Sequence, residues 1–308
     1  MSVVRFRRSP ASGRDAADAI RAGRSWLAGG GRAIAVGGGK GGTGKSLITA
    51  NLAVLASLRG RGAIAVDADL GLANLHLLLG IDPEADLSSL LDARRAVGPG
   101  DLLAAGPAGV RLLPGASGVA RLAGLNRGEL RRLVERLESH LPGDGPVFFD
   151  LSSGLSPATQ LFLRAAHEVV IVANPEPTAV LDAYGVVKML AEGGHAGRIH
   201  LVMNRARDPR AAEEFAGRIA DTARQYLDRG VDVLGAVPED EAVAASIQRR
   251  RPVVLDRPQS PAAAALRTIA QRLLVDAEPA ADTLGAFFST ARGLLAPRSR
   301  VTRSSCAS

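Results

Sequence analysis

The chain of 308 residues is poor in cysteine, lysine and aromatic residues. It contains one cysteine and three lysines, and 3% of its residues are aromatic. The single cysteine, Cys306, cannot form a disulfide within the chain, which predicts a reducing compartment such as the cytoplasm. No run of about 18 apolar residues is present to span a membrane, and the arginine-containing N-terminus lacks the apolar segment of a secretory signal. These absences argue against a secreted disulfide scaffold and an integral membrane protein.

Positive charge is concentrated at the two ends of the chain. The net charge is +7. Residues 1–32 hold seven Arg and two Asp, and residues 278–308 hold four Arg, one Asp and one Glu, so the residues between them sum to zero. A neutral central region does not favour nucleic acid as a partner, and DNA binding is therefore not expected.

Two of the three lysines lie in a glycine-rich stretch, Gly37-Gly38-Gly39-Lys40-Gly41-Gly42-Thr43-Gly44-Lys45-Ser46. Residues 39–46 match the phosphate-binding pattern G-x-x-x-x-G-K-[ST]. An apolar run at 33–36 precedes the stretch and a helical pattern at 47–58 follows it, as this motif requires. The motif predicts that Lys45 contacts the β- and γ-phosphates of a nucleotide and that Ser46 binds Mg²⁺. The backbone around the phosphates is then that of Gly39, Gly41, Gly42, Thr43 and Gly44.

Short apolar runs alternate with helical patterns along the remaining chain. The runs are 33–36, 63–66, 110–113, 147–149, 168–173, 199–203 and 231–237, and clear helical patterns cover 129–140, 178–191 and 211–227. Continuous apolar strands alternating with helices predict an α/β fold: a doubly wound, mostly parallel sheet with helices on both faces. We expect a flexible basic segment with a short helix at 1–31, one domain at 32–277 and a tail at 278–308.

Three acidic residues stand where predicted strands end. Asp67 and Asp69 follow the second run, and Asp150 follows the run at 147–149. The carboxyl ends of parallel strands share one edge of a sheet, so these side chains should lie near the phosphate loop. An apolar strand ending in Asp is typical of a magnesium-binding carboxylate, and we expect Asp150 to hold Mg²⁺ through water.

The position of Lys40 within the glycine loop resembles the deviant Walker A motif of the MinD/ParA ATPase family. Further matches are similar to the FlhG/FleN/YlxH branch, the flagellar number regulators, and together they extend over residues 33–275. They are Asn174-Pro175-Glu176-Pro177-Thr178, Asp182-Ala183-Tyr184 with Lys188, Met203-Asn204-Arg205, Val237-Pro238-Glu239-Asp240 and Pro252-Val253-Val254.

This resemblance implies an Mg²⁺-dependent ATPase of P-loop NTPase fold that forms a homodimer when ATP is bound. Lys40 would contact the phosphates bound by the partner subunit, Asp69 would orient the attacking water, and Asp67 would support Asp69 and the Mg²⁺ shell. Adenine would be surrounded by Asn204, Pro238 and Asp240. The implied location is cytoplasmic and peripheral, on the inner face of the bacterial cell membrane.

Each end of the chain contains a further candidate binding element. Residues 282–297 form an amphipathic helical pattern with arginines after it, which predicts a helix that binds membrane lipid. Residues 15–21 resemble the element through which flagellar relatives bind a GTPase partner of the FlhF type, although Ala16 stands where relatives have Gln. That difference predicts binding with impaired stimulation.

Two other functions are compatible with the motifs. One is a DNA partition ATPase of the ParA type, with Arg249, Arg250 and Arg251 as a basic patch. The other is a scaffold that binds ATP but hydrolyses little of it. Guanine is disfavoured as the base because none of the lysines follows an asparagine, as the GTPase base-reading motif requires.

Overall fold

The computed structural model describes residues 31–60, 62–91, 98, 101–116, 124–143, 145–275 and 283–297. The predicted partner-binding element at 15–21 lies outside the described residues. Strands are β1 (Ala33–Gly37), β2 (Ile64–Ala68), β3 (Ala104–Ala105), β4 (Arg111–Leu113), β5 (Val147–Leu151), β6 (Glu168–Ala173), β7 (Arg198–Ala206) and β8 (Asp232–Pro238). All seven predicted strands are confirmed, and the prediction missed only the two-residue β3.

Helices connect nearly all of these strands. They are α2 (Lys45–Ser57), α3 (Leu75–Leu79), α5 (Arg127–His140), α6 (Pro157–Ala165), α7 (Pro177–Glu192), α8 (Pro209–Leu227), α9 (Glu241–Gln248), α10 (Val253–Asp256), α11 (Pro261–Val275) and α12 (Thr283–Leu294). Two short 3₁₀ turns, Leu87–Leu90 and Pro107–Gly109, lie before and after β3. Several helix starts follow from local sequence, such as the capping box that Asn126 and Glu129 form at α5.

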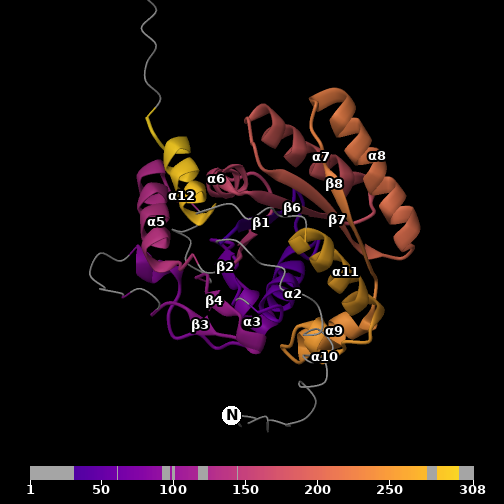
Figure 1. Cartoon of the computed structure of the whole chain (residues 1–308), viewed down its shortest axis with the longest axis horizontal. Helices are drawn as coiled ribbons and strands as arrows, with labels where there is room; N and C mark the ends of the chain where they lie inside the picture. The colour runs from indigo at the N-terminus through magenta and orange to yellow at the C-terminus, as the bar shows by residue number, and fades with distance from the viewer. Residues whose placement is uncertain are drawn as a thin grey trace, which may run out of the picture.

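The strands form one eight-stranded sheet in the order β3-β4-β2-β5-β1-β6-β7-β8 (Figure 1). Each neighbouring pair is parallel except β3 and β4. The strand β1 lies between β5 and β6, so the loop after it lies at the carboxyl ends of the strands, near the middle of the sheet. This is the doubly wound fold that the alternating pattern predicted.

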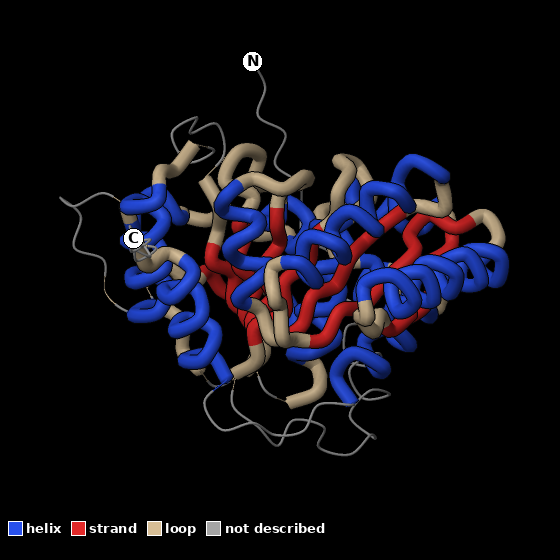
Figure 2. Tube along the Cα trace, turned by 90° about the horizontal axis from the view of Figure 1, so that it is seen from above, coloured by secondary structure: helices blue, strands red, loops and turns tan. Residues whose placement is uncertain are grey.

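Helices cover both faces of the sheet (Figure 2). Side chains between the sheet and these helices form two apolar cores. Successive residues of β1 show the division, since Ala35 belongs to one core and Ile34 and Val36 to the other. The first core includes residues of α5, α6, α7, α8 and α12, and the second includes residues of α2, α3, α10 and α11. Burial on both faces explains why the strands read as continuous apolar runs.

Helix α12 forms where the sequence predicted a helix, but it packs on its own domain. Phe287 and Phe288 are 0% and 1% exposed, and the Phe287 ring stacks on Phe149 with 4.8 Å between centroids. Arg127 from α5 donates to the carbonyl of Leu294 at 3.0 Å. The prediction of an apolar face available to lipid at 282–297 is therefore wrong for this structure, because protein covers that face. In the part of the chain that the structure describes, no helix could cross a membrane.

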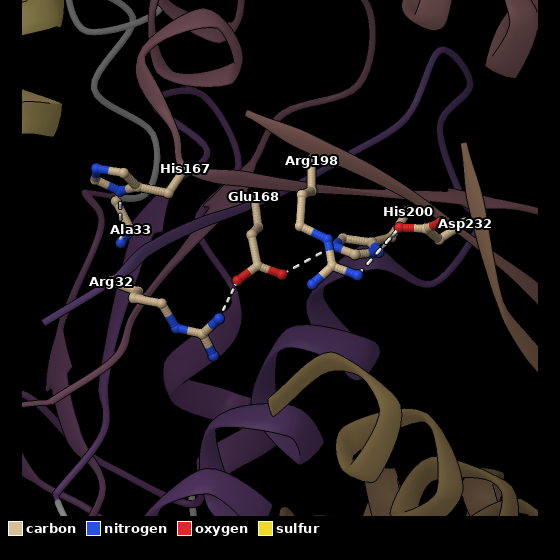
Figure 3. A network of polar contacts seen from close by, with 7 residues as sticks. All are labelled: Arg32, Ala33, His167, Glu168, Arg198, His200 and Asp232. Atoms are coloured by element: carbon tan, nitrogen blue, oxygen red, sulfur yellow. Dashed lines mark hydrogen bonds and ion pairs between the residues drawn. The ribbon is translucent and has the colours of Figure 1, made fainter. Parts of the chain in front are cut away.

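A buried polar network lies at the amino ends of the strands, at the end of the sheet opposite to the glycine-rich loop (Figure 3). The carboxylate of Glu168 accepts from Arg32 and, at 2.8 Å, is bonded to Nε2 of His200. Nδ1 of His167 accepts from the backbone N–H of Ala33 at 3.2 Å. Burial raises the pKa of Glu168, but His200 and Arg32 outweigh burial and bring this pKa below its usual value. The network thus joins the starts of β1, β6 and β7 and explains four polar residues that have no part in the phosphate site.

Candidate nucleotide-binding site

The glycine-rich loop connects β1 to α2 at the middle of the sheet edge. Gly44 is the N-cap of α2 with φ 92°, a left-handed conformation that favours glycine. A β-carbon at Gly44 would lie 2.2 Å from Nδ2 of Asn204, which donates to the carbonyl of Thr43 at 2.7 Å. Glycine is therefore required here by both backbone conformation and space. The structure assigns Asn204, which was predicted to contact adenine, a role in holding the loop.

The first part of the loop packs against the start of α7. A β-carbon at Gly39 would lie 2.6 Å from that of Asp182. Lys40 points away from the loop, and its Nζ contacts Glu176 Oε2 at 3.1 Å and Thr178 Oγ1 at 3.5 Å. The side chains of Lys40 and Glu176 are 43% and 54% exposed. Lys40 therefore has a partner within its own chain and remains accessible from outside.

Lys45 is the first residue of α2 and is buried, unlike Lys40. Its Nζ donates to the carbonyl of Lys40 at 3.4 Å, so it is directed back over the loop. Burial lowers the pKa of Lys45, while the nearby carboxylates of Asp150 and Asp69 partly offset this effect. An ammonium group so placed at a helix N-terminus is suited to contact phosphate.

Asp150 at the end of β5 faces the hydroxyl groups of α2. Thr49 Oγ1 donates to Asp150 Oδ1 at 3.1 Å, and the Ser46 hydroxyl also lowers the pKa of Asp150. Burial and the charge of Asp67 nevertheless raise that pKa to about 8. Oδ2 of Asp150 is buried without a hydrogen-bond partner. A buried, unpartnered carboxylate oxygen beside a serine hydroxyl fits the oxygen donors that Mg²⁺ prefers.

Asp67 and Asp69 organise the loop between β2 and α3. Asp67 pairs with Asp150 across adjacent strands, and its two oxygens accept from the backbone N–H groups of Asp69 at 3.3 Å and Leu75 at 2.9 Å. Burial raises the pKa of Asp67 to about 6, although these N–H groups oppose the shift. Asp69 Oδ1 accepts from the N–H groups of Gly71 and Leu72, both at 3.2 Å. Asp67 thus fixes the loop from within, and Asp69 stands in it at the pocket.

A pocket of about 730 Å³ opens at the phosphate loop, and its lining does not include Lys40, Asp67 or Asp150. The predicted site residues that do line it come from the loop, from the start of α2, and from β7, β8 and the segments after β2 and β8: Gly41, Gly42, Gly44, Lys45, Ser46, Asp69, Asn204, Pro238 and Asp240. Both oxygens of Asp240 already accept backbone N–H groups, from Ala242 at 2.9 Å and Ala262 at 3.0 Å. Asp240 therefore caps α9 and ties it to α11, and it does so from a position in the pocket lining.

Sequence reasoning missed several residues of the site. The pocket has an apolar wall of Leu72, Leu77, Leu78, Val243 and Ile247, and the partners of Lys40 on α7 were not predicted. These residues are brought to the site only by tertiary packing. Thr49 had a usable signal, because a hydroxyl three residues after Ser46 on a helix lies on the same side as Ser46.

The chain as a whole is similar to known proteins. Residues 34–253 match the family model of the CobQ/CobB/MinD/ParA nucleotide binding domain. The chain belongs to this family. As a member of the CobQ/CobB/MinD/ParA family it has the P-loop NTPase fold, and the resemblance found in its sequence is confirmed.

Two curated relatives and one solved structure illustrate the likeness of this MinD/ParA-family chain. It is 33% identical over 240 residues to the antiactivator FleN of Pseudomonas aeruginosa, covering 78% of this chain and 85% of that protein. It is 29% identical over 220 residues to the flagellum site-determining protein YlxH of Helicobacter pylori, covering 71% and 73%. The septum site-determining protein MinD from Pyrococcus horikoshii, complexed with Mg-ADP, has a TM-score of 0.64 and 26% identity, covering 83% and 98%.

Proposed function

We propose that this protein is an Mg²⁺-dependent ATPase that acts as a dimerising switch and regulates flagellar number or placement. One observation carries the proposal: the pocket brings together Lys45, Ser46 and Asp69 from separate segments, beside the buried Asp150. A phosphate loop with a lysine, a metal-binding pair and a loop carboxylate is the set that phosphoryl transfer to water requires.

Each residue has a distinct role in the proposed hydrolysis. Lys45 and the backbone N–H groups of the loop bind the phosphate oxygens and stabilise the charge that develops on them. Ser46 and Asp150 would hold Mg²⁺, which would supply positive charge that stabilises the phosphate groups during transfer. Asp69 would orient the attacking water, and Asp67 holds the backbone of the Asp69 loop in place for that task.

Dimerisation across the nucleotide face is supported by what that face exposes. Large apolar side chains in segments that follow strands there remain exposed, including Leu72 at 77% and Leu181 at 71%. Exposed apolar groups around a binding site are typical of a protein interface. In the proposed dimer Lys40 leaves Glu176 and contacts the partner's nucleotide.

The flagellar assignment rests on the names of the relatives. FleN is called an antiactivator and YlxH a flagellum site-determining protein. Cytoplasmic location with peripheral attachment to the inner face of the membrane belongs to the same proposal. Attachment through α12 would require this helix to leave its position on the domain, because Phe287 and Phe288 are buried there. An FlhF-type GTPase partner is a proposal for residues 15–21.

The alternative of a DNA partition ATPase receives less support from the charges. Two arginines of the candidate basic patch are paired with carboxylates, Arg249 with Asp256 and Arg250 with Asp82. A scaffold with little hydrolysis is disfavoured because Asp69 lines the pocket.

Two variants test the proposal in a phosphate-release assay with a parallel measurement of ATP binding. Lys45→Ala is expected to abolish binding, because the only ammonium in the pocket lining is removed. Asp69→Ala is expected to retain ATP binding within about threefold and to lose hydrolysis by about 100-fold or more, in the range seen for a lost water-orienting group. Hydrolysis by Asp69→Ala at the rate of the parent would refute the role given to this carboxylate.

A further inference from the structure

The proposed function leaves unused a motif in the sequence, the three consecutive arginines between α9 and α10. Arg249 stays within this helix pair, where its Nε and Nη2 bind Asp256 at 3.0 Å and 2.5 Å. Arg250 reaches outside the pair. Its Nη2 donates to the carbonyl of Ile81 at 3.0 Å and to Asp82 Oδ1 at 2.6 Å. Arg250 therefore connects the end of α9 with the residues that follow α3.

Arg250 has a backbone conformation in which arginine is uncommon. The N–H groups of Arg250 and Arg251 donate to the carbonyls of Ile247 at 2.9 Å and Ser246 at 3.0 Å, the two bonds of a Schellman helix end. Arg250 stands at the left-handed position of that motif, with φ 52°. Glycine is normally preferred there because a β-carbon disfavours this conformation. The local backbone thus does not select arginine, and the contacts of the side chain supply the reason.

Helix α3 ends in the same motif and packs against this turn. The N–H groups of Gly80 and Ile81 donate to Leu77 at 3.2 Å and His76 at 2.9 Å, and Gly80 has φ 69°. A β-carbon at Gly80 would lie 2.5 Å from the carbonyl oxygen of Arg250. Glycine on one side thus permits contact between the two helix ends, and the guanidinium group from the other side binds the carbonyl of Ile81, two residues after α3.

Both helices form the apolar wall of the nucleotide pocket. Leu77 and Leu78 come from α3, and Val243 and Ile247 come from α9. We propose that Arg250 is a positioning residue that holds α3 and α9 together and thereby sets the shape of the wall that receives the nucleotide. The identity of the ligand in this proposal rests on the proposed function, whereas the contact between the helices does not.

The test replaces Arg250 by the residue that the backbone prefers. Arg250→Gly removes the contact to Ile81 and Asp82 while relieving the left-handed backbone, so a melting temperature equal to or above that of the parent is expected. The dissociation constant of a fluorescent ATP analogue and the KM for ATP should rise five- to tenfold, with kcat changed less than twofold. Arg250→Lys, which keeps the charge toward Asp82, should recover part of the affinity.

Arg249→Ala is the matched control, because it removes an ion pair from the same turn without touching the residues after α3. It is expected to lower the melting temperature and to leave ATP affinity within twofold of the parent. The proposal is overturned if Arg250→Gly binds ATP within twofold of the parent, or if Arg249→Ala weakens binding equally.

Hydrogen exchange of residues 75–82 separates this proposal from the proposed function. Faster exchange in Arg250→Gly but not in Arg249→Ala supports the contact even if the parent binds no ATP, in which case only the proposed function fails. Equal exchange in both variants overturns the contact. Should Arg250→Gly not fold, Asp82→Asn decides in its place, with an expected two- to threefold rise in KM; an unchanged KM refutes the proposal.

Discussion

Two lysines five positions apart in one loop have different surroundings and therefore different chemistry. Lys45 is 8% exposed and directed over the loop, where desolvation strengthens its attraction to phosphate. Lys40 is exposed and paired with Glu176, which directly precedes α7. An ammonium group with an exposed partner can exchange that partner for another anion at small cost, since such surface pairs contribute about 0.2–1 kcal/mol.

This contrast predicts the effects of two substitutions on ATP-dependent dimerisation. Lys40→Ala should abolish the dimer but leave ATP binding by the monomer within about twofold, because the lysine points away from its own pocket. Glu176→Gln should tighten the dimer by about two- to fivefold, since it frees Lys40 from a pair worth about 0.2–1 kcal/mol. Sedimentation with a non-hydrolysed ATP analogue measures both effects.

The control for Glu176→Gln is Glu192→Gln. Glu192 ends α7, the helix that Glu176 precedes, and forms a similarly exposed pair with Lys188, with 3.8 Å between Nζ and Oε1. If both substitutions change the dimer equally, the effect comes from net charge and not from the release of Lys40.

At the residue scale, the sequence predicted the groups that lie in contiguous motifs. The loop from Gly39 to Ser46 and the strand-end acids were found because their neighbours along the chain define them. The contact of Lys40 with Glu176 and the apolar wall were not found, because they join segments more than a hundred residues apart. The link that Asp240 makes between α9 and α11 was also not predicted, because it depends on how these helices pack.

At the scale of elements, α12 shows that a helix can be predicted without its partner. Its apolar face at Leu284, Phe287 and Phe288 has the 3.6-residue spacing that favours a helix, and a helix is present. The spacing states only that one face is apolar, and it cannot distinguish lipid from the groove between α5 and α6. The short β3 was missed for a different reason: two residues are too few to show any periodicity.

Helix α12 is predicted to stabilise the fold. Phe287→Ala should lower the free energy of unfolding by about 3–5 kcal/mol, as a buried phenylalanine in a core does, because Phe287 stacks on both Phe149 and Phe162. Thr290→Ala on the exposed side of the same helix should change it by less than about 0.5 kcal/mol. Urea denaturation measures both values, and a loss below about 1 kcal/mol for Phe287→Ala would contradict the docked position.

At the scale of the whole molecule, buried carboxylates have opposite pKa shifts at the two ends of the strands. At the edge where strands begin, Glu168 is bonded to Arg32 and His200 (Figure 3), and its pKa is below the usual value. At the nucleotide edge, Asp67 and Asp150 are buried side by side, and the pKa of each is raised. Ionised Glu168 therefore stabilises the fold, whereas ionised Asp67 and Asp150 destabilise it at the end where the proposed metal would bind.

This opposition predicts how stability depends on pH. A native pKa of about 8 for Asp150, above the unfolded value of about 4, means that the native state without nucleotide holds an extra proton between these limits. Its stability should therefore fall as pH rises through this range. Asp150→Asn should remove the part of that fall that comes from Asp150 and leave the smaller part that comes from Asp67. Its melting temperature above pH 8 should exceed that of the parent by about 2–4 °C or more. Thermal denaturation at pH 5, 6.5 and 8.5 without Mg²⁺ measures the difference in melting temperature between Asp150→Asn and the parent. If Asp150 does not cause the loss of stability, this difference stays constant with pH.

The docking of α12 also has a consequence for how the protein is synthesised. Phe149 adjoins Asp150 in β5, yet the ring that covers it belongs to Phe287, about 140 residues later. At about 5–20 residues per second, a ribosome needs roughly 7–28 s to cover that distance. During this interval the rings of Phe149 and Phe162 lack their cover, so the nascent chain presents an apolar groove that chaperones can bind. The strand β5, which contains Asp150, therefore reaches its final packing only after α12 has left the ribosome.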